Sequence, residues 1–133
     1  MLPMKSLKIG IVLLFLVKVS SAQYSLTFCE SVNDAGKALH PSNFFMVSPN
    51  GSALKFLLKA DDGFKTDKMD FKIFFINEAG KEEEISKMAQ KIEPKWNYTW
   101  KEVVFFDPGN YRVKVYDSKG QYLTSANVSV KQQ

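Results

Sequence analysis

The feature that most constrains the fold is a two-residue alternation of apolar and polar side chains, which recurs from residue 24 onward. It is clearest in 111–116, where three apolar side chains alternate with Arg112 and Lys114. Because successive side chains of a strand point to opposite faces of a sheet, this period indicates strands with one buried face. Turn-forming residues separate the runs. They are Asn50-Gly51, Asp61-Asp62-Gly63, Glu78–Lys81, Asp107–Asn110 and Asp117–Gly120.

The pattern therefore predicts an all-β chain. The expected strands cover 24–30, 43–47, 53–60, 70–77, 96–100, 102–106, 111–116 and 122–131. Segment 81–93 stays open between two structures. Four apolar residues from Ile85 to Ile92 lie at helical spacing behind three glutamates, which suit a helix N-terminus. A short edge strand fits equally well, and Pro94 ends either element.

Three pairs of adjacent phenylalanines must each send one ring to either face of a strand. The pairs are Phe44-Phe45, Phe74-Phe75 and Phe105-Phe106. We expect one ring of each pair in the core and the other covered within the domain. An uncovered ring would instead mark an interface.

The first 22 residues have the pattern of a cleaved signal peptide rather than of a folded segment. Two lysines precede an apolar run at 9–17, and the small residues Ser20, Ser21 and Ala22 follow. The run is shorter than the roughly 20 apolar residues that span a bilayer. We therefore expect 1–22 to be removed and 23–133 to form a single exported domain, periplasmic or extracellular, with no integral membrane anchor.

Charge and cysteine content narrow the classes of protein further. The chain has 18 basic and 14 acidic residues, a net charge of +4. Three of the lysines lie in 1–22, so residues 23–133 carry 15 basic and 14 acidic side chains. A nearly neutral domain has no overall electrostatic attraction to nucleic acid. Cys29 is the only cysteine, which excludes an internal disulfide. A disulfide-free exported domain suits the bacterial envelope.

The sequence Asp107-Pro108-Gly109-Asn110-Tyr111-Arg112-Val113 resembles the D-x-G-x-Y-x-C signature of immunoglobulin-like domains and its P-G-x-Y version in fibronectin type III-like domains. The resemblance implies an immunoglobulin-like antiparallel β-sandwich of about seven strands. It also implies a tyrosine corner at Asp107, Gly109 and Tyr111, in which the tyrosine hydroxyl bonds back to the backbone upstream. Val113 replaces the usual cysteine. The whole chain is similar to small uncharacterised exported proteins of Gram-negative bacteria.

Trp96, Tyr98 and Trp100 are the candidate ligand-binding residues. Their two-residue spacing places all three on one side of a strand. An exposed row of flat aromatic rings would bind the apolar faces of sugars at little entropic cost. The competing interpretation, which we favour, is that the strand turns these rings into the core, where two tryptophans are well accommodated.

The chain has few residues that could serve in catalysis or bind a metal, with one histidine and one cysteine. Cys29 and His40 are the only possible nucleophile and base of that kind, and such residues are more commonly a packed side chain and a surface imidazole. The aspartates at 61, 62, 67 and 70 lack the ligand spacing of a calcium loop, and they indicate a solvated turn. We expect no enzyme activity, no metal and no cofactor.

The expected function is that of a non-enzymatic interaction module binding a protein or glycan partner in the cell envelope. One alternative is a carbohydrate-binding module that uses the three aromatic residues. Another is a proteinase inhibitor that acts through loop 61–67 or 107–110. The glycosylation patterns at Asn50, Asn97 and Asn127 matter only in a eukaryotic secretory pathway. The oligomeric state stays open.

Overall fold

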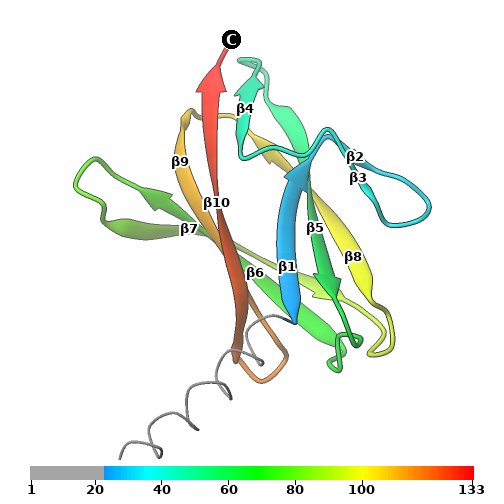
Figure 1. Cartoon of the computed structure of the whole chain (residues 1–133). Coiled ribbons are helices and arrows are strands. Elements are labelled where there is room, and N and C mark those ends of the chain that lie inside the picture. Colours follow the sequence, from blue (N-terminus) through cyan, green and yellow to red (C-terminus); the bar gives the residue numbers. More distant parts are fainter. Residues whose placement is uncertain (1–22) are drawn as a thin grey trace, which may run out of the picture.

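The polypeptide forms two β-sheets packed face to face, without a helix among the described residues (Figure 1). The computed structural model describes residues 23–133, and the expected signal peptide, 1–22, lies outside them. Within 23–133 no helix is long and apolar enough to cross a membrane. The all-β prediction is confirmed for this part of the chain.

The smaller sheet has the antiparallel order β1-β5-β8. Its strands are β1 (Tyr24–Cys29), β5 (Ser52–Ala60) and β8 (Tyr98–Phe105). A small hairpin follows β1 and consists of β2 (Ser31–Val32) and β3 (Ala38–Leu39). The described residues form ten strands, against about seven expected. The sequence did not predict β2 and β3, because two-residue strands show no alternation, and it left segment 81–93 undecided. The two expected strands 96–100 and 102–106 form one strand, β8, because the alternation continues through Lys101.

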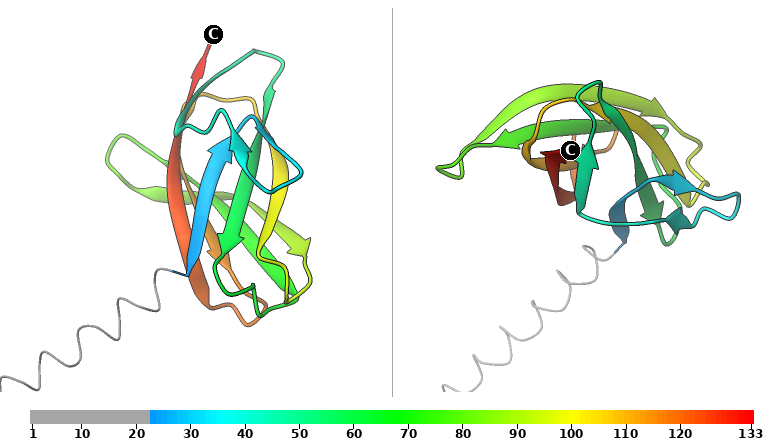
Figure 2. Two further views of the ribbon diagram at one scale, coloured as in Figure 1. Left: turned by 45° about the vertical axis from the view of Figure 1, so that its right-hand side comes forward. Right: turned by 90° about the horizontal axis from the view of Figure 1, so that it is seen from above.

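The larger sheet has the order β4-β10-β9-β6-β7. Its strands are β4 (Phe44–Val47), β10 (Tyr122–Gln132), β9 (Gly109–Tyr116), β6 (Lys68–Ile76) and β7 (Glu82–Lys91). All pairs are antiparallel except β4 with β10, which are parallel over four residues only. Seen from above, the β6–β7 hairpin extends away from the body of the domain (Figure 2).

The core lies between the sheets and follows the predicted alternation. Phe56 of β5 is fully buried and contacts rings from β6 and β8, with centroid distances of 6.2 Å to both Phe71 and Phe105. Val113 and Val115 of β9 are also fully buried. Burial of these side chains is the main source of stability, because no disulfide links the sheets.

Segment 81–93 forms an edge strand, β7, and not a helix. It pairs with β6 and has a bulge opposite Ile73 and Phe74. The spacing of the apolar residues in 81–93 also allowed a helix, but Ile85 is the bulge residue and is 51 % exposed. It therefore does not share a buried face with Ile92, as a helix would require. Charged residues along β7 protect the open edge against pairing with other chains.

We expected the outward ring of each phenylalanine pair to be covered within the domain, and this prediction is wrong for two of the three pairs. Phe45 and Phe105 are buried, whereas Phe44 and Phe106 are 45 % and 56 % exposed. Phe44 lies on the outer surface of β4. Phe106 follows β8, and the turn at Gly51 packs against its ring without covering it. Phe74, the outward member of the third pair, is half-buried beneath a lysine ammonium.

The turn before β9 has the geometry of a tyrosine corner. The Tyr111 hydroxyl donates a hydrogen bond to the Asp107 carbonyl at 2.8 Å, and its ring packs edge-on against Phe75 and Phe105. Burial, and secondarily the Asp107 carboxylate, raises the pKa of Tyr111. At Gly109 a Cβ would lie 2.7 Å from Phe75 Cε1, so any larger residue would have to displace the Phe75 ring.

Candidate functional site

The three predicted aromatic residues fall into two groups. Tyr98 and Trp100 are alternate residues of β8 that point outward, with Thr99 buried between them. Trp96 lies in the turn before β8, not in the strand as expected. Its N–H donates to the Glu93 carbonyl at 3.0 Å, which closes a turn after Pro94 and delays the start of the strand.

Both tryptophans are exposed, and the expectation of a core position does not hold for them. Trp96 is 45 % exposed and Trp100 is 43 % exposed. Tyr98 is half-buried instead, because the β2–β3 loop covers it. Its hydroxyl donates to the Asp34 carbonyl at 3.1 Å, and a Cβ at Gly36 would lie 2.5 Å from its ring. Tyr98 thus holds the loop, and two indole rings are available to a ligand.

Trp96 and Trp100 border an open hollow of about 750 Å³, which we call the β8 hollow. Tyr98 and five polar residues complete its lining: Gln90, Asn97, Thr99, Lys101 and Glu102. The Gln90 amide donates to Thr99 Oγ1 at 3.2 Å and to the Trp100 carbonyl at 3.3 Å. This surface combines two aromatic rings with amide, ammonium and carboxylate groups.

Lys55 of β5 holds the Trp100 ring in place. Its Nζ lies 5.0 Å from the ring centroid and 3.2 Å from Glu102 Oε1. A cation over an indole face contributes about 0.5–1 kcal/mol at an exposed site. The ring is therefore oriented before any ligand arrives, which lowers the entropic cost of stacking.

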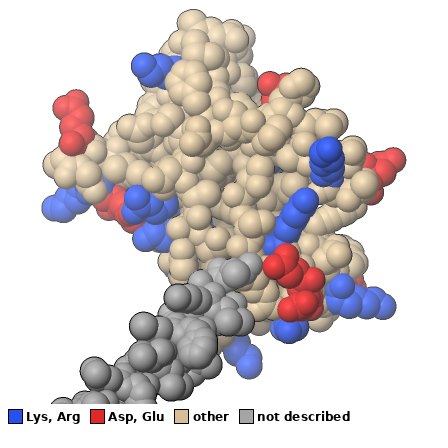
Figure 3. All heavy atoms as spheres, in the orientation of Figure 1, with Lys and Arg blue, Asp and Glu red and all other residues tan. Residues whose placement is uncertain are grey.

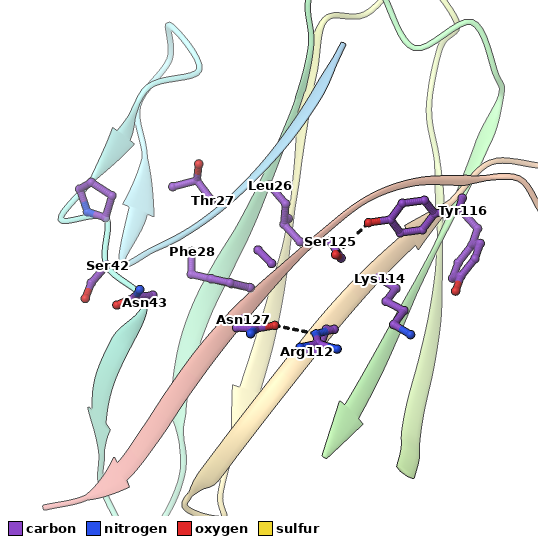
Figure 4. Close-up of a pocket in the computed structure, with 13 residues that line it drawn as sticks. Leu26, Thr27, Phe28, Ser42, Asn43, Arg112, Lys114, Tyr116, Ser125 and Asn127 are labelled. Carbon is purple, nitrogen blue, oxygen red and sulfur yellow. Dashed lines mark hydrogen bonds between the residues drawn. The ribbon is translucent and has the colours of Figure 1, made fainter. Parts of the chain in front are cut away.

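A second hollow of about 980 Å³ lies between β1 and the first half of β10; we call it the β1–β10 groove (Figure 4). Leu26, Phe28 and Ala126 give it an apolar side, and Arg112 and Lys114 of β9 stand on its polar side. No sequence pattern predicted this groove. Its polar residues show the ordinary alternation of an outward strand face, and no local pattern reveals that two distant strands leave space between them.

Glu82 of β7 pairs with both cations of the groove. It contacts Arg112, and its Oε1 lies 2.9 Å from Lys114 Nζ. The hydrogen bond from Lys114, followed by the charges of both cations, lowers the pKa of Glu82. Two positive charges thus share one carboxylate, and the polar side of the groove keeps a net positive charge.

The residues considered for catalysis are not arranged as a site. Cys29 is fully buried, burial raises the pKa of its thiol, and its Sγ lies 3.7 Å from the Lys55 carbonyl. A thiol in this environment is a packed side chain. His40 is exposed in a loop at a φ of 55°. Among residues 23–133 no three His, Cys, Asp or Glu side chains gather as metal ligands.

The two loops considered for proteinase inhibition are held against the domain. In loop 61–67, Phe64 is 1 % exposed and its N–H donates to the Trp96 carbonyl at 3.0 Å. Loop 107–110 contains the acceptor of the Tyr111 hydroxyl. No observation on these loops favours inhibition.

Comparison with known proteins gives a likeness of fold. No model of a protein family matches the chain, and no curated protein matches its sequence. Among solved structures, an immunoglobulin-like protein from Pseudomonas aeruginosa is similar, with a TM-score of 0.51, 10 % identity, and coverage of 84 % of this chain and 99 % of that one. A CARDB domain from Pyrococcus furiosus, solved in complex with di-metal ions, aligns with a TM-score of 0.45, 13 % identity, and coverage of 84 % and 96 %. The first likeness shows an immunoglobulin-like β-sandwich fold.

Proposed function

We propose that residues 23–133 are an exported, non-enzymatic binding module whose ligand is a carbohydrate held in the β8 hollow. The observation that carries this proposal is the exposure of Trp96 and Trp100 beside amide and carboxylate groups. Sugar rings have apolar faces that stack on indoles and hydroxyls that need hydrogen-bond partners around the rim. Export rests on the signal pattern of residues 1–22, and N-terminal sequencing of the secreted protein tests it.

The Trp100 side chain is the main stacking surface in this proposal. Lys55 fixes its orientation, and Glu102 and Gln90 lie close enough in the lining to accept or donate hydrogen bonds to sugar hydroxyls. Trp96 comes from a different segment, the turn from Glu93 to Trp96, and it adds a second ring to the lining of the hollow. The arrangement calls on no cofactor or metal.

The test uses the intrinsic fluorescence of the two tryptophans, which are the only ones in the chain. Free protein is expected to emit as exposed tryptophan does and to be quenched by acrylamide. Soluble β-glucan, xylan, mannan and peptidoglycan fragments are then titrated, and binding is expected to shift the emission to shorter wavelength and to protect it from acrylamide.

Variants separate stacking from unspecific adsorption. Trp100→Ala is expected to weaken binding at least tenfold, about 1.4 kcal/mol. Tyr122→Ala is the matched control, because Tyr122 is also an exposed aromatic residue but lies on the other sheet. If no polysaccharide binds, or if both variants bind equally well, the carbohydrate proposal is wrong and a protein ligand becomes the better hypothesis.

A further inference from the structure

The β1–β10 groove contains a strand edge that has no partner within residues 23–133. β4 pairs with β10 only from Ser129 to Gln132. Because the two strands are parallel, the edge of β10 from Tyr122 to Val128 lies before Phe44, the first residue of β4. The Ser129 N–H donates to the Asn43 carbonyl at 2.8 Å, which shows that Ser129 points toward β4. Alternate residues of a strand direct their backbone groups to the same side. The N–H and C=O groups of Ser125 and Asn127 therefore face the groove.

The surroundings of this edge would suit an added strand. Leu26, Phe28 and Ala126 line the side of the groove between the two sheets, and Leu26 and Ala126 are only partly buried. At one end the chain crosses from β1 toward β4, where the Ser42 N–H donates to the Phe28 carbonyl at 3.0 Å. In the part of the surface over β1 and the middle of β10 that Figure 3 leaves in view, no charged side chains are seen, and basic and acidic side chains lie to either side.

The outer side of the same edge is basic. In the β9–β10 ladder, Arg112 lies opposite Asn127 and Lys114 lies opposite Ser125. The Arg112 Nε donates to Asn127 Oδ1 at 2.8 Å (Figure 4), and both cations share the single carboxylate of Glu82. A strand placed beside β10 would direct alternate side chains to the apolar side and to this basic surface.

We propose that the β1–β10 groove binds an extended segment of a partner protein, which adds to the open edge of β10 as a strand in line with β4. The segment is five or six residues long, because six residues of β10 span roughly 20 Å. Its side chains alternate between apolar and acidic, to match the apolar side and the two cations. Main-chain hydrogen bonds to Ser125 and Asn127 supply affinity, and the alternation supplies specificity. This site is independent of the carbohydrate proposal for the β8 hollow.

The probe is a labelled eight-residue peptide of alternating valine and glutamate, blocked at both ends, and its binding is followed by fluorescence anisotropy. Saturable binding is expected, together with at least tenfold slower hydrogen exchange at the Ser125 and Asn127 amides. A valine–lysine peptide is expected to bind at least tenfold more weakly, because it meets Arg112 and Lys114. Trp100→Ala protein should bind the peptide as the wild type does.

Two variants at one position test the role of the backbone. Ser125→Pro removes the N–H that faces the groove and is expected to weaken peptide binding at least fivefold. Ser125→Ala keeps that N–H and should bind within twofold of the wild type. If Ser125→Pro fails to fold, peptides N-methylated at alternate residues replace it: one register should abolish binding and the other should retain it.

Three results would overturn the proposal. The first is absence of saturable peptide binding up to millimolar concentration, and the second is binding without a change in exchange at Ser125 and Asn127. The third is a concentration-dependent dimer in which these two amides are protected without peptide, since a second copy of the chain would then occupy the groove.

Discussion

Replacing Tyr111 with phenylalanine removes one hydroxyl from the core and leaves the ring in place. Tyr111 is 4 % exposed, and its hydroxyl donates to the Asp107 carbonyl at 2.8 Å. Without this donor the carbonyl is left unpaired in a partly buried turn, which costs about 1–2 kcal/mol of the free energy of unfolding. For a domain of this size that loss lowers Tm by roughly 4–9 °C.

The assay is urea unfolding followed by far-ultraviolet circular dichroism. Tryptophan fluorescence is a poor probe here, because both tryptophans are already exposed in the folded protein. Tyr122→Phe is the control: it also loses a hydroxyl hydrogen bond, to Ser125 Oγ at 2.9 Å, but at an exposed position, and we expect a change below about 0.5 kcal/mol. Tyr111→Ala removes the ring as well and should cost about 3–5 kcal/mol.

The reasoning is refuted if Tyr111→Phe and Tyr122→Phe unfold at the same urea concentration with equal slopes. The corner bond would then contribute nothing beyond what water supplies in the unfolded chain. Equal destabilisation by Tyr111→Phe and Tyr111→Ala would also contradict the prediction. The packing of the ring would then contribute no stability beyond that of the hydroxyl hydrogen bond.

Three further predictions concern packing, acid and thiol chemistry. Gly109→Ala should lower the free energy of unfolding by about 1–3 kcal/mol in the same urea assay, because its Cβ would lie 2.7 Å from Phe75 Cε1; wild-type stability would contradict this. The lowered pKa of Glu82 means that its stabilising effect is present above its ordinary pKa of 4.5 and is lost as pH falls through the folded-state value. Glu82→Gln should therefore flatten the loss of Tm on acidification, whereas Glu83→Gln, at a position without an ion pair in 23–133, should leave it steep. The Cys29 thiol should react with Ellman's reagent only on unfolding, because it is fully buried and its pKa is raised; prompt labelling of native protein would show otherwise.

Much of the fold could be predicted because the deciding information is local. The alternation in 111–116 and 53–60 follows from burial of one strand face, and it holds in β9 and β5. The tyrosine corner at 107–111 is also set locally, because Gly109 and the acceptor of the Tyr111 hydroxyl lie within four residues of Tyr111. Segment 81–93 stayed undecided because the bulge in β7 interrupts the alternation, and the residues on either side then mimic helical spacing.

The candidate sites were less predictable because they depend on contacts between distant segments. Tyr98 is covered by a loop whose Asp34 carbonyl lies 64 residues earlier in the chain. The exposure of Trp96 follows from a turn that ends before β8 begins. The β1–β10 groove exists because β4 begins only at Phe44, opposite Ser129. The sequence predicted where this strand begins but not that it would pair with β10. The role of Trp96, Tyr98 and Trp100 in binding remains a prediction.

The order of the strands along the chain has a consequence for how the protein folds. Successive strands alternate between the two sheets. β1, β5 and β8 belong to the smaller sheet, and β4, then β6 and β7, and finally β9 and β10 belong to the larger one. Neither sheet consists of one continuous stretch of the chain, so most strand pairs join segments that are distant in sequence. Topologies dominated by such non-local pairs fold in milliseconds to seconds. We therefore expect one cooperative barrier, with the β8 hollow and the β1–β10 groove appearing together. A nascent chain would present neither surface to a partner until the last strand is in place.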